Sequence, residues 1–265
     1  MKKRKKNTLL WKVTNRESGV ESYVFGTIHL RDKRVYFRLE EVEGYIDKSD
    51  VFIAEYPLDD AGSGNIMEVL QLPEGKHLKN YIPTKKYEKL SKAIYKSFGI
   101  DLDRLGFFRP MVIENMLTES MFANDFEFPM DIILWNYAND REKLTIGAET
   151  TESQIKIMRR FPIKQQLKSL IDIGKNTKKY RRKIKKLIGL YEKQDVKELH
   201  KKTIKSLGKM KDVLVHNRNE RIVETFDKYS NDQKVFLAVG AGHFFGGKGI
   251  LKLLKSKGYK VKPVY

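Results

Sequence analysis

Four short apolar runs in this chain each end directly before a histidine or a glutamate. The runs cover residues 23–28, 51–54, 144–148 and 235–242, and the residues that follow them are His29, Glu55, Glu149 and His243. Short β-branched runs bounded by small residues are typical of buried strands. In open α/β sheets, ligands bind in the crevice outside the carboxyl ends of the strands. The pattern therefore predicts a sheet with two histidines and two glutamates, a coordination set, at one edge.

The segments between these strands have the periodicity of amphipathic helices. Residues 37–46 are predicted to form a helix between the strands 22–28 and 51–55, and the short connections favour a parallel pair. Residues 66–142 and 151–230 are mainly helical in pattern, and we expect them to cover the sheet. The predicted fold class is α/β, with a central mixed, mostly parallel sheet flanked by helices and a helical insertion in the middle of the chain. We expect residues 1–265 to form a single domain.

The residues at the strand ends have the chemistry of a transition-metal site. Imidazole and carboxylate ligands suit zinc, manganese, iron or cobalt better than calcium or magnesium. Two histidines and one or two glutamates leave open positions at which water is activated, and a spare glutamate can act as general base. Gly26 and Gly240 each lie three residues before a histidine, where a missing Cβ lets backbone or ligand come close. Taken singly, each histidine is equally compatible with a core or capping role and each glutamate with a helix N-cap, but the repeated GxxH spacing favours a site.

The strongly positive net charge of the chain bears on its possible partners. The chain has 53 Lys and Arg against 34 Asp and Glu, a formal net charge of +19, which suits nucleic acid, anionic lipid or acidic substrates. Residues 175–186 carry eight Lys or Arg in twelve residues. An apolar stripe through Ile184, Ile188 and Tyr191 predicts an ordered helix with a solvated basic back. We expect no specific nucleic-acid partner, because no recognition motif accompanies this charge; a weak contact of helix 175–186 with an anionic surface stays an alternative.

The absence of cysteine and the N-terminal sequence bear on the chemistry and the localisation of the protein. The chain has no cysteine, which excludes disulfides, thiolate nucleophiles and Cys-ligated zinc. Residues 1–7 are basic like the start of a signal peptide, but no apolar stretch long enough for a signal peptide or a membrane helix follows. As written, the sequence predicts a cytoplasmic protein, and an exported protein without its leader would show the same pattern.

Motifs in a fixed order along nearly the whole chain carry a family resemblance. They are residues 10–13 (LWKV), 24–29 (VFGTIH), 54–55 (AE), 147–154 (GAETTESQ), 214–222 (LVHNRNERI), 240–243 (GAGH) and 258–261 (GYKV). With these motifs the chain resembles the TraB/PrgY/GumN family, which includes the TIKI proteases. The middle helices follow a pattern of their own, so the substrate does not transfer with the resemblance.

The resemblance implies a metal-dependent, metallopeptidase-like hydrolase. The implied site residues are His29, Glu55, Glu149 and His243, with Arg218 and Asn219 in support. Members with shown activity resemble manganese- or cobalt-dependent metallopeptidases, so the implied cofactor is a divalent transition metal, Mn or Co, with Zn also compatible. The implied substrate is a peptide or protein. Either glutamate could be the metal ligand and the other the base.

Two further interpretations stay open at this level. A guanidinium such as that of Arg218 can hold a carboxylate or stabilise charge that develops during hydrolysis. The alternative function is a non-catalytic protein that sequesters a peptide or small ligand in the same cleft. Oligomeric state is not indicated by any motif.

Several other polar residues have more ordinary predictions. Asp131 follows a proline and is predicted to cap a helix, with a place at the site as the alternative. His77, His200 and His216 lie in polar, Lys-rich surroundings and are predicted to be surface residues.

Overall fold

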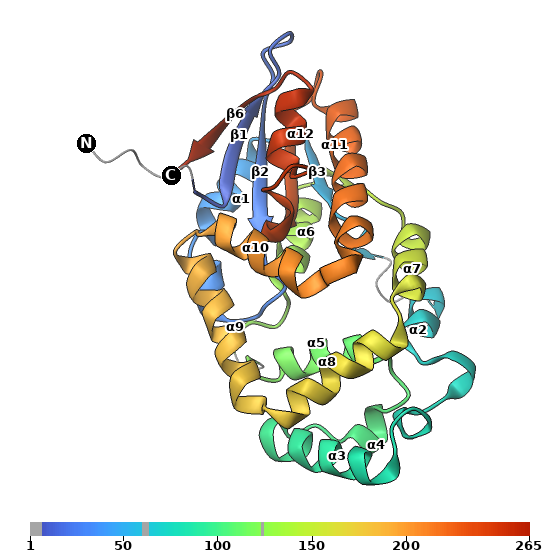
Figure 1. The fold of residues 1–265 in the computed structure, drawn as a ribbon. Helices are drawn as coiled ribbons and strands as arrows, with labels where there is room; N and C mark the ends of the chain where they lie inside the picture. The colour runs from blue at the N-terminus through green and yellow to red at the C-terminus, as the bar shows by residue number, and fades with distance from the viewer. Residues whose placement is uncertain (1–6, 60–63, 123–124) are drawn as a thin grey trace.

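A six-stranded mixed sheet forms the centre of the computed structural model, which describes residues 7–59, 64–122 and 125–265 (Figure 1). Its strands are β1 (Leu10–Thr14), β2 (Glu21–Thr27), β3 (Val51–Ala54), β4 (Leu144–Gly147), β5 (Val235–Gly240) and β6 (Lys260–Val264). They lie in the order β4-β3-β5-β2-β1-β6. The pairs among β2, β5, β3 and β4 are parallel, whereas β1 is antiparallel to β2 and to β6. The predicted mixed, mostly parallel sheet is confirmed; the basic residues 1–6 lie outside the described part.

One detail of the predicted topology is wrong. The strands β2 and β3 are parallel, but they are not neighbours, because β5 lies between them and bonds to both. Five of the six residues of β5 are buried, which suits a central position in the sheet. A local strand–helix–strand pattern cannot reveal this insertion, since β5 lies almost 200 positions further along the chain.

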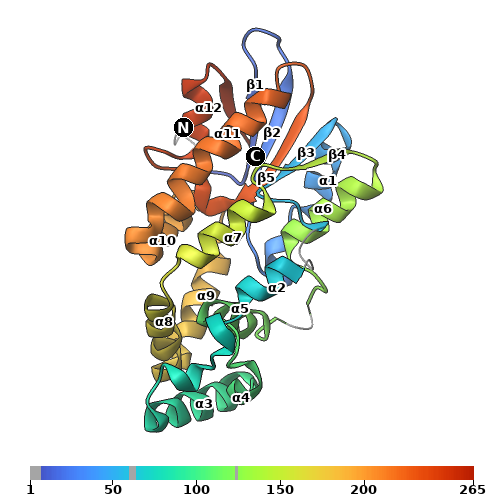
Figure 2. The same cartoon turned by 90° about the vertical axis from the view of Figure 1, so that its right-hand side faces the viewer.

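Twelve α-helices surround the sheet in the described residues. They are α1 (Leu39–Asp47), α2 (Gly64–Leu70), α3 (Thr84–Phe98), α4 (Leu102–Leu105), α5 (Pro110–Glu119), α6 (Met130–Asp140), α7 (Thr151–Arg160), α8 (Ile163–Lys175), α9 (Thr177–Glu192), α10 (Val196–Leu207), α11 (Asn217–Tyr229) and α12 (Ile250–Ser256). Helices α1 and α6 cover one face of the sheet, and α11 and α12 cover the other (Figure 2). None of the helices in the described part is both long and apolar enough to cross a membrane.

The middle of the chain forms a separate layer of helices. Helices α3, α4, α5 and α8 pack on one another beyond the carboxyl ends of the strands, rather than over a face of the sheet (Figures 1 and 2). The expectation that residues 66–142 cover the sheet therefore holds for α6 but not for α3 to α5. Amphipathic helices can bury their apolar stripes against each other as well as against strands. One apolar core joins this layer to the sheet. A continuous core is compatible with a single domain, and the single domain over 1–265 stays a prediction.

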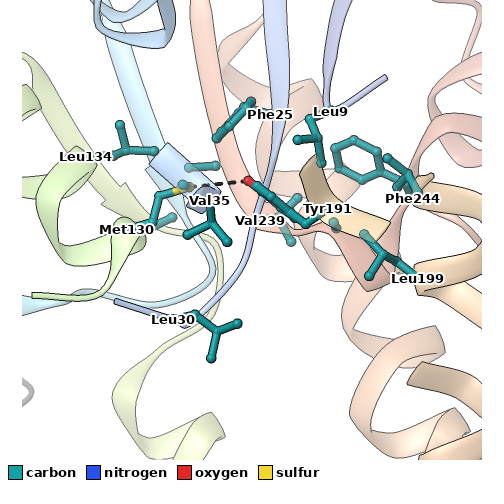
Figure 3. Packing of buried hydrophobic residues seen from close by; sticks show 14 of the residues in the cluster. Leu9, Phe25, Leu30, Val35, Met130, Leu134, Tyr191, Leu199, Val239 and Phe244 are labelled. Carbon is teal, nitrogen blue, oxygen red and sulfur yellow. Dashed lines mark hydrogen bonds between the residues drawn. The ribbon is translucent and has the colours of Figure 1, made fainter. Parts of the chain in front are cut away.

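The predicted basic helix is present and connects the helical layer to the sheet. Helix α9 buries Tyr180, Ile184, Ile188 and Tyr191, so its apolar stripe is confirmed. Figure 3 shows Tyr191 reaching into the core, where its hydroxyl lies 3.3 Å from Met130 Sδ. The same hydroxyl donates a hydrogen bond of 2.6 Å to the carbonyl oxygen of Gly26. Because Gly26 lies three residues before His29, helix α9 helps to position the end of β2.

Candidate functional site

The carboxyl ends of four parallel strands meet at one edge of the sheet. The register pairs Thr27 of β2 with Gly240 of β5, and Ala54 of β3 with Gly147 of β4. The parallel ladder continues one step beyond the strands, where the amide of Glu149 donates to the carbonyl oxygen of Glu55 at 3.0 Å. The strand order consequently sets Glu149, Glu55, His243 and His29 along this edge in that sequence.

Glu55 lies at the centre of the edge, with its side chain 13% exposed, and holds its negative charge. Its Oε1 accepts a hydrogen bond of 2.9 Å from the Gly240 amide, and its Oε2 accepts one of 2.6 Å from Arg218 Nη2. Burial alone would raise the pKa of Glu55, but Arg218, His243 and His29 together bring that pKa well below its usual range. A Cβ on Gly240 would lie 3.2 Å from Glu55 Oε1, so glycine there leaves room for the carboxylate.

Glu149 is fully buried and has both carboxylate oxygens engaged by side chains. Arg218 Nε and Gln154 Nε2 donate to Oε2, at 2.5 and 2.7 Å. Arg221 donates to Oε1 through both Nε and Nη2. Arg218 is itself buried and bridges the glutamates at the ends of the two adjacent strands. Glu149 therefore serves in this arrangement as a partner for arginines.

The surroundings of His243 determine which ring nitrogen carries the proton. The Asn219 side-chain amide donates to two carbonyl oxygens, those of His243 and Lys248, at 3.1 and 2.7 Å. Its Oδ1 is therefore an acceptor, and His243 Nδ1, 2.6 Å away, must be the donor. Burial lowers the pKa of His243 to about 4, so the ring is neutral at pH 7. The lone pair then lies on Nε2, which is 3.9 Å from Glu55 Oε1.

His29 lies at the exposed end of the same edge. Its side chain is 57% exposed, and its Nδ1 lies 3.0 Å from Asp131 Oδ1. The Asp131 carboxylate raises the pKa of His29. His29, Asp131, Glu55 and Tyr56 are among the residues that line one small cavity. The prediction that Asp131 caps a helix is wrong, because helix α6 has Pro129 at its N-cap and no side-chain cap.

The donor atoms at this edge suit a divalent transition metal only in part. Across the described ranges, no three His, Asp or Glu side chains are arranged to hold a metal ion as they lie. Two ligand atoms about 2.1 Å from one ion can be at most about 4.2 Å apart, and His243 Nε2 and Glu55 Oε1 meet that limit at 3.9 Å. His29 is a third donor of the same type at the open side. Glu149 does not fit, since two donor atoms already engage each of its oxygens, whereas each oxygen of Glu55 accepts from one donor.

Sequence reasoning missed several residues of this cluster. Arg221 and Gln154 bind Glu149 from helices α11 and α7. A signal for Arg221 was present, because it lies three positions after Arg218 and so on the same helix face. The three histidines predicted at the surface, His77, His200 and His216, are partly buried. His200 Nδ1 contacts the carbonyl oxygen of Gly242, directly before His243, at 2.7 Å.

The fold and the site together define an α/β protein with a buried, charged His/Glu/Arg cluster at the carboxyl edge of a parallel sheet. The model of the TraB/PrgY/gumN family matches residues 9–263, and the chain belongs to this family. It is 24% identical over 314 residues to Metalloprotease TIKI2 of Danio rerio, covering 97% of this chain and 61% of that protein. Identity to Metalloprotease TIKI2 of Xenopus tropicalis is 22%, over 97% and 60%. Identity to the Metalloprotease TIKI homolog of Nematostella vectensis is 21%, over 97% and 67%. The chain thus spans about three fifths of the length of the two TIKI2 proteins.

Proposed function

We propose that this protein is a metal-dependent hydrolase, most similar in chemistry to a metallopeptidase. The observation that carries the proposal is the pair of His243 Nε2 and Glu55 Oε1, 3.9 Å apart at the edge where His29 also lies. Two histidines and a carboxylate form a donor set that hydrolytic metal sites use, with positions left for water and substrate. The relatives named metalloproteases support a peptide or protein as the substrate class.

In this proposal His29, His243 and Glu55 contact the metal, with Mn or Co preferred and Zn compatible. When bound, the ion supplies polarisation of a carbonyl oxygen and acidification of a water molecule. Glu55 suits the ligand role better than the base role, because its lowered pKa makes it a weak proton acceptor. Asn219 fixes the His243 ring with Nε2 toward Glu55.

Glu149 and Arg218 have supporting roles in the proposal. Glu149 orients Arg218 from one side while Glu55 binds it from the other. A guanidinium held in this way is a fixed positive charge beside the site, and such a charge can stabilise an oxyanion without reorganisation during the reaction. Arg221, whose side chain is partly exposed, pairs with the other oxygen of Glu149.

The first experiment is a metal titration of the metal-free protein. Calorimetry with Mn²⁺, Co²⁺ and Zn²⁺ should give one ion per chain in the wild type and no measurable binding in His29→Ala/His243→Ala. The control is His77→Gln, whose ring packs against Tyr87 and Phe107 in the helical layer. Equal affinity in the wild type and the double variant would overturn the ligand assignment.

A second experiment separates hydrolysis from sequestration of a ligand in the same cleft. The manganese-loaded protein is incubated with a peptide library at a large molar excess, and products are counted by mass spectrometry. More than one product per protein molecule, absent from the double variant, supports the hydrolase. Saturable peptide binding with no product would instead favour the non-catalytic function.

A further inference from the structure

The two GxxH histidines each have a side-chain oxygen beside Nδ1, and the two oxygens come from helices on opposite faces of the sheet. Asn219, in the first turn of α11, contacts Nδ1 of His243 at 2.6 Å. Asp131, in the first turn of α6, contacts Nδ1 of His29 at 3.0 Å. Helices α6 and α11 cover different faces of the sheet (Figure 2). In both cases a side-chain oxygen from the first turn of a helix lies close to Nδ1, the ring nitrogen nearer the backbone.

Asp131 places a buried carboxylate oxygen beside His29. Its Oδ1 is buried and has no partner with hydrogen-bond geometry within the described residues, although His29 Nδ1 is close by. The side chain is 14% exposed and lines the cavity that Glu55 also lines. A buried carboxylate without bonds costs free energy unless a nearby group compensates for it. His29 is the cationic or hydrogen-bonding group that stands closest to it.

We propose that Asp131 is the positioning residue of His29, accepting the Nδ1 hydrogen so that Nε2 is presented to the site. The inference rests on the proposed function, because it concerns how His29 would meet a metal ion. A carboxylate can only accept, so in the neutral ring it selects the form with the proton on Nδ1 and the lone pair on Nε2. Metal-ligating histidines commonly bind a carboxylate or a carbonyl through the second ring nitrogen, and this contact orients the ring and raises its basicity. Asp131 thus has for the exposed histidine the role that Asn219 has for the buried one.

The test compares three variants by metal affinity. Asp131→Ala removes the acceptor, Asp131→Asn keeps an acceptor oxygen without charge, and Asp140→Asn changes an exposed carboxylate at the far end of the same helix. Loss of such an orienting partner costs about 10- to 100-fold in metal affinity, which we expect for Asp131→Ala with Mn²⁺ and Co²⁺. Asp131→Asn should lose less, and Asp140→Asn should match the wild type. Circular dichroism and the thermal midpoint establish that each variant is folded.

Two further readouts separate positioning from direct ligation and from a failure of the proposed function. The visible spectrum of the Co²⁺ protein should keep its bands in Asp131→Asn, because the ligands are unchanged; lost or shifted bands would assign Asp131 as a ligand and overturn the positioning role. In the metal-free protein labelled with ¹⁵N-histidine, Asp131→Ala should shift the Nδ1 resonance of His29 and leave that of His243 unchanged.

The outcomes for the two proposals differ. If the wild type binds metal, His29→Ala/His243→Ala does not, and Asp131→Ala stays within about twofold of the wild type, only the role of Asp131 is overturned. If the wild type binds no metal, the proposed function fails, and an unchanged His29 Nδ1 resonance in Asp131→Ala would overturn the contact itself.

Discussion

Arg218 is the residue on which the charge balance of the site depends. The parallel pairing of β3 and β4 brings the buried carboxylate of Glu149 and the mostly buried carboxylate of Glu55 to adjacent strand ends, and like charges on neighbouring strands repel strongly in a protein interior. The guanidinium of Arg218 donates to both, through Nη2 and Nε. The planar guanidinium has N–H donors in fixed directions and can bind two carboxylates at once, whereas a lysine ammonium is a compact point charge without this geometry. The same residue therefore serves the fold and the proposed chemistry.

Replacement of Arg218 by alanine should destabilise the protein severely. The change leaves Glu55 and Glu149 buried without their shared partner, and breaking a buried pair in this way costs about 3–5 kcal/mol. Urea denaturation, compared with the wild type, measures the loss. The matched control is Arg221→Ala, because Arg221 is 44% exposed and Glu149 keeps Arg218; its loss should be about 1 kcal/mol or less. Equal losses for the two variants would contradict the central role of Arg218.

The sequence located the glutamates but could not divide their roles. Both follow a short apolar run, so the local sequence pattern around Glu55 and Glu149 is the same. The difference arises from residues distant in the chain: Arg221 is 72 positions from Glu149, and the Gly240 amide is 185 positions from Glu55. Only the packed structure brings these donors to one carboxylate and not to the other.

At the scale of elements, helix α11 connects the site to the far end of the sheet. Its first turn supplies Arg218 and Asn219, and its last turn supplies Asp227, which accepts hydrogen bonds from Lys257 and Tyr259 at 2.7 Å each. Tyr259 lies directly before β6. Because both ends of α11 are tied to other elements, the helix cannot tilt without breaking polar contacts at one of them.

Asp227→Asn should weaken the protein in a pH-dependent way. Burial would raise the pKa of Asp227, but the hydrogen bonds from Lys257 and Tyr259 overcome this and lower it below its ordinary 3.8. A lowered folded-state pKa contributes stability above the unfolded-state value, and this contribution is lost as pH falls through the folded-state pKa. The variant should therefore be about 1 kcal/mol less stable at pH 7, and the difference from the wild type should shrink as pH falls below 3.8. Urea denaturation across this range tests it; a difference that does not change with pH would show that charge is not the cause.

At the scale of the whole molecule, the net charge of +19 acts on stability as well as on partners. Many of the cations lie on helices such as α9, whose buried stripe leaves its Lys and Arg residues on the solvent side. Excess charge of one sign destabilises a compact state by self-repulsion. Helix α9 is therefore an ordered element, but its positive charge lowers the free energy of unfolding at low ionic strength.

Salt should consequently stabilise this protein. Raising NaCl from 50 to 500 mM shortens the Debye length from about 14 to about 4 Å, which screens repulsion among surface lysines more than it weakens buried pairs such as Glu149 with Arg218. The thermal midpoint should rise by a few degrees. The control is the same titration after the exposed Arg182, Lys183 and Lys185 are changed to Gln, which should reduce the rise. A midpoint that falls with salt would mean that surface ion pairs outweigh the net repulsion.

The sequence by itself determined the types of the elements and the four residues at the strand ends. Periodicity, β-branched runs and the GxxH spacing are local properties, so they predict α9, β5 and the edge that carries His29 and His243 without knowledge of the fold. Tertiary structure alone decided that β5 separates β2 from β3, that α3 to α5 pack beyond the sheet, and that Asp131 contacts His29. Each of these depends on hydrogen bonds or burial between segments far apart in the chain, and the free energy of such contacts exists only once the segments meet.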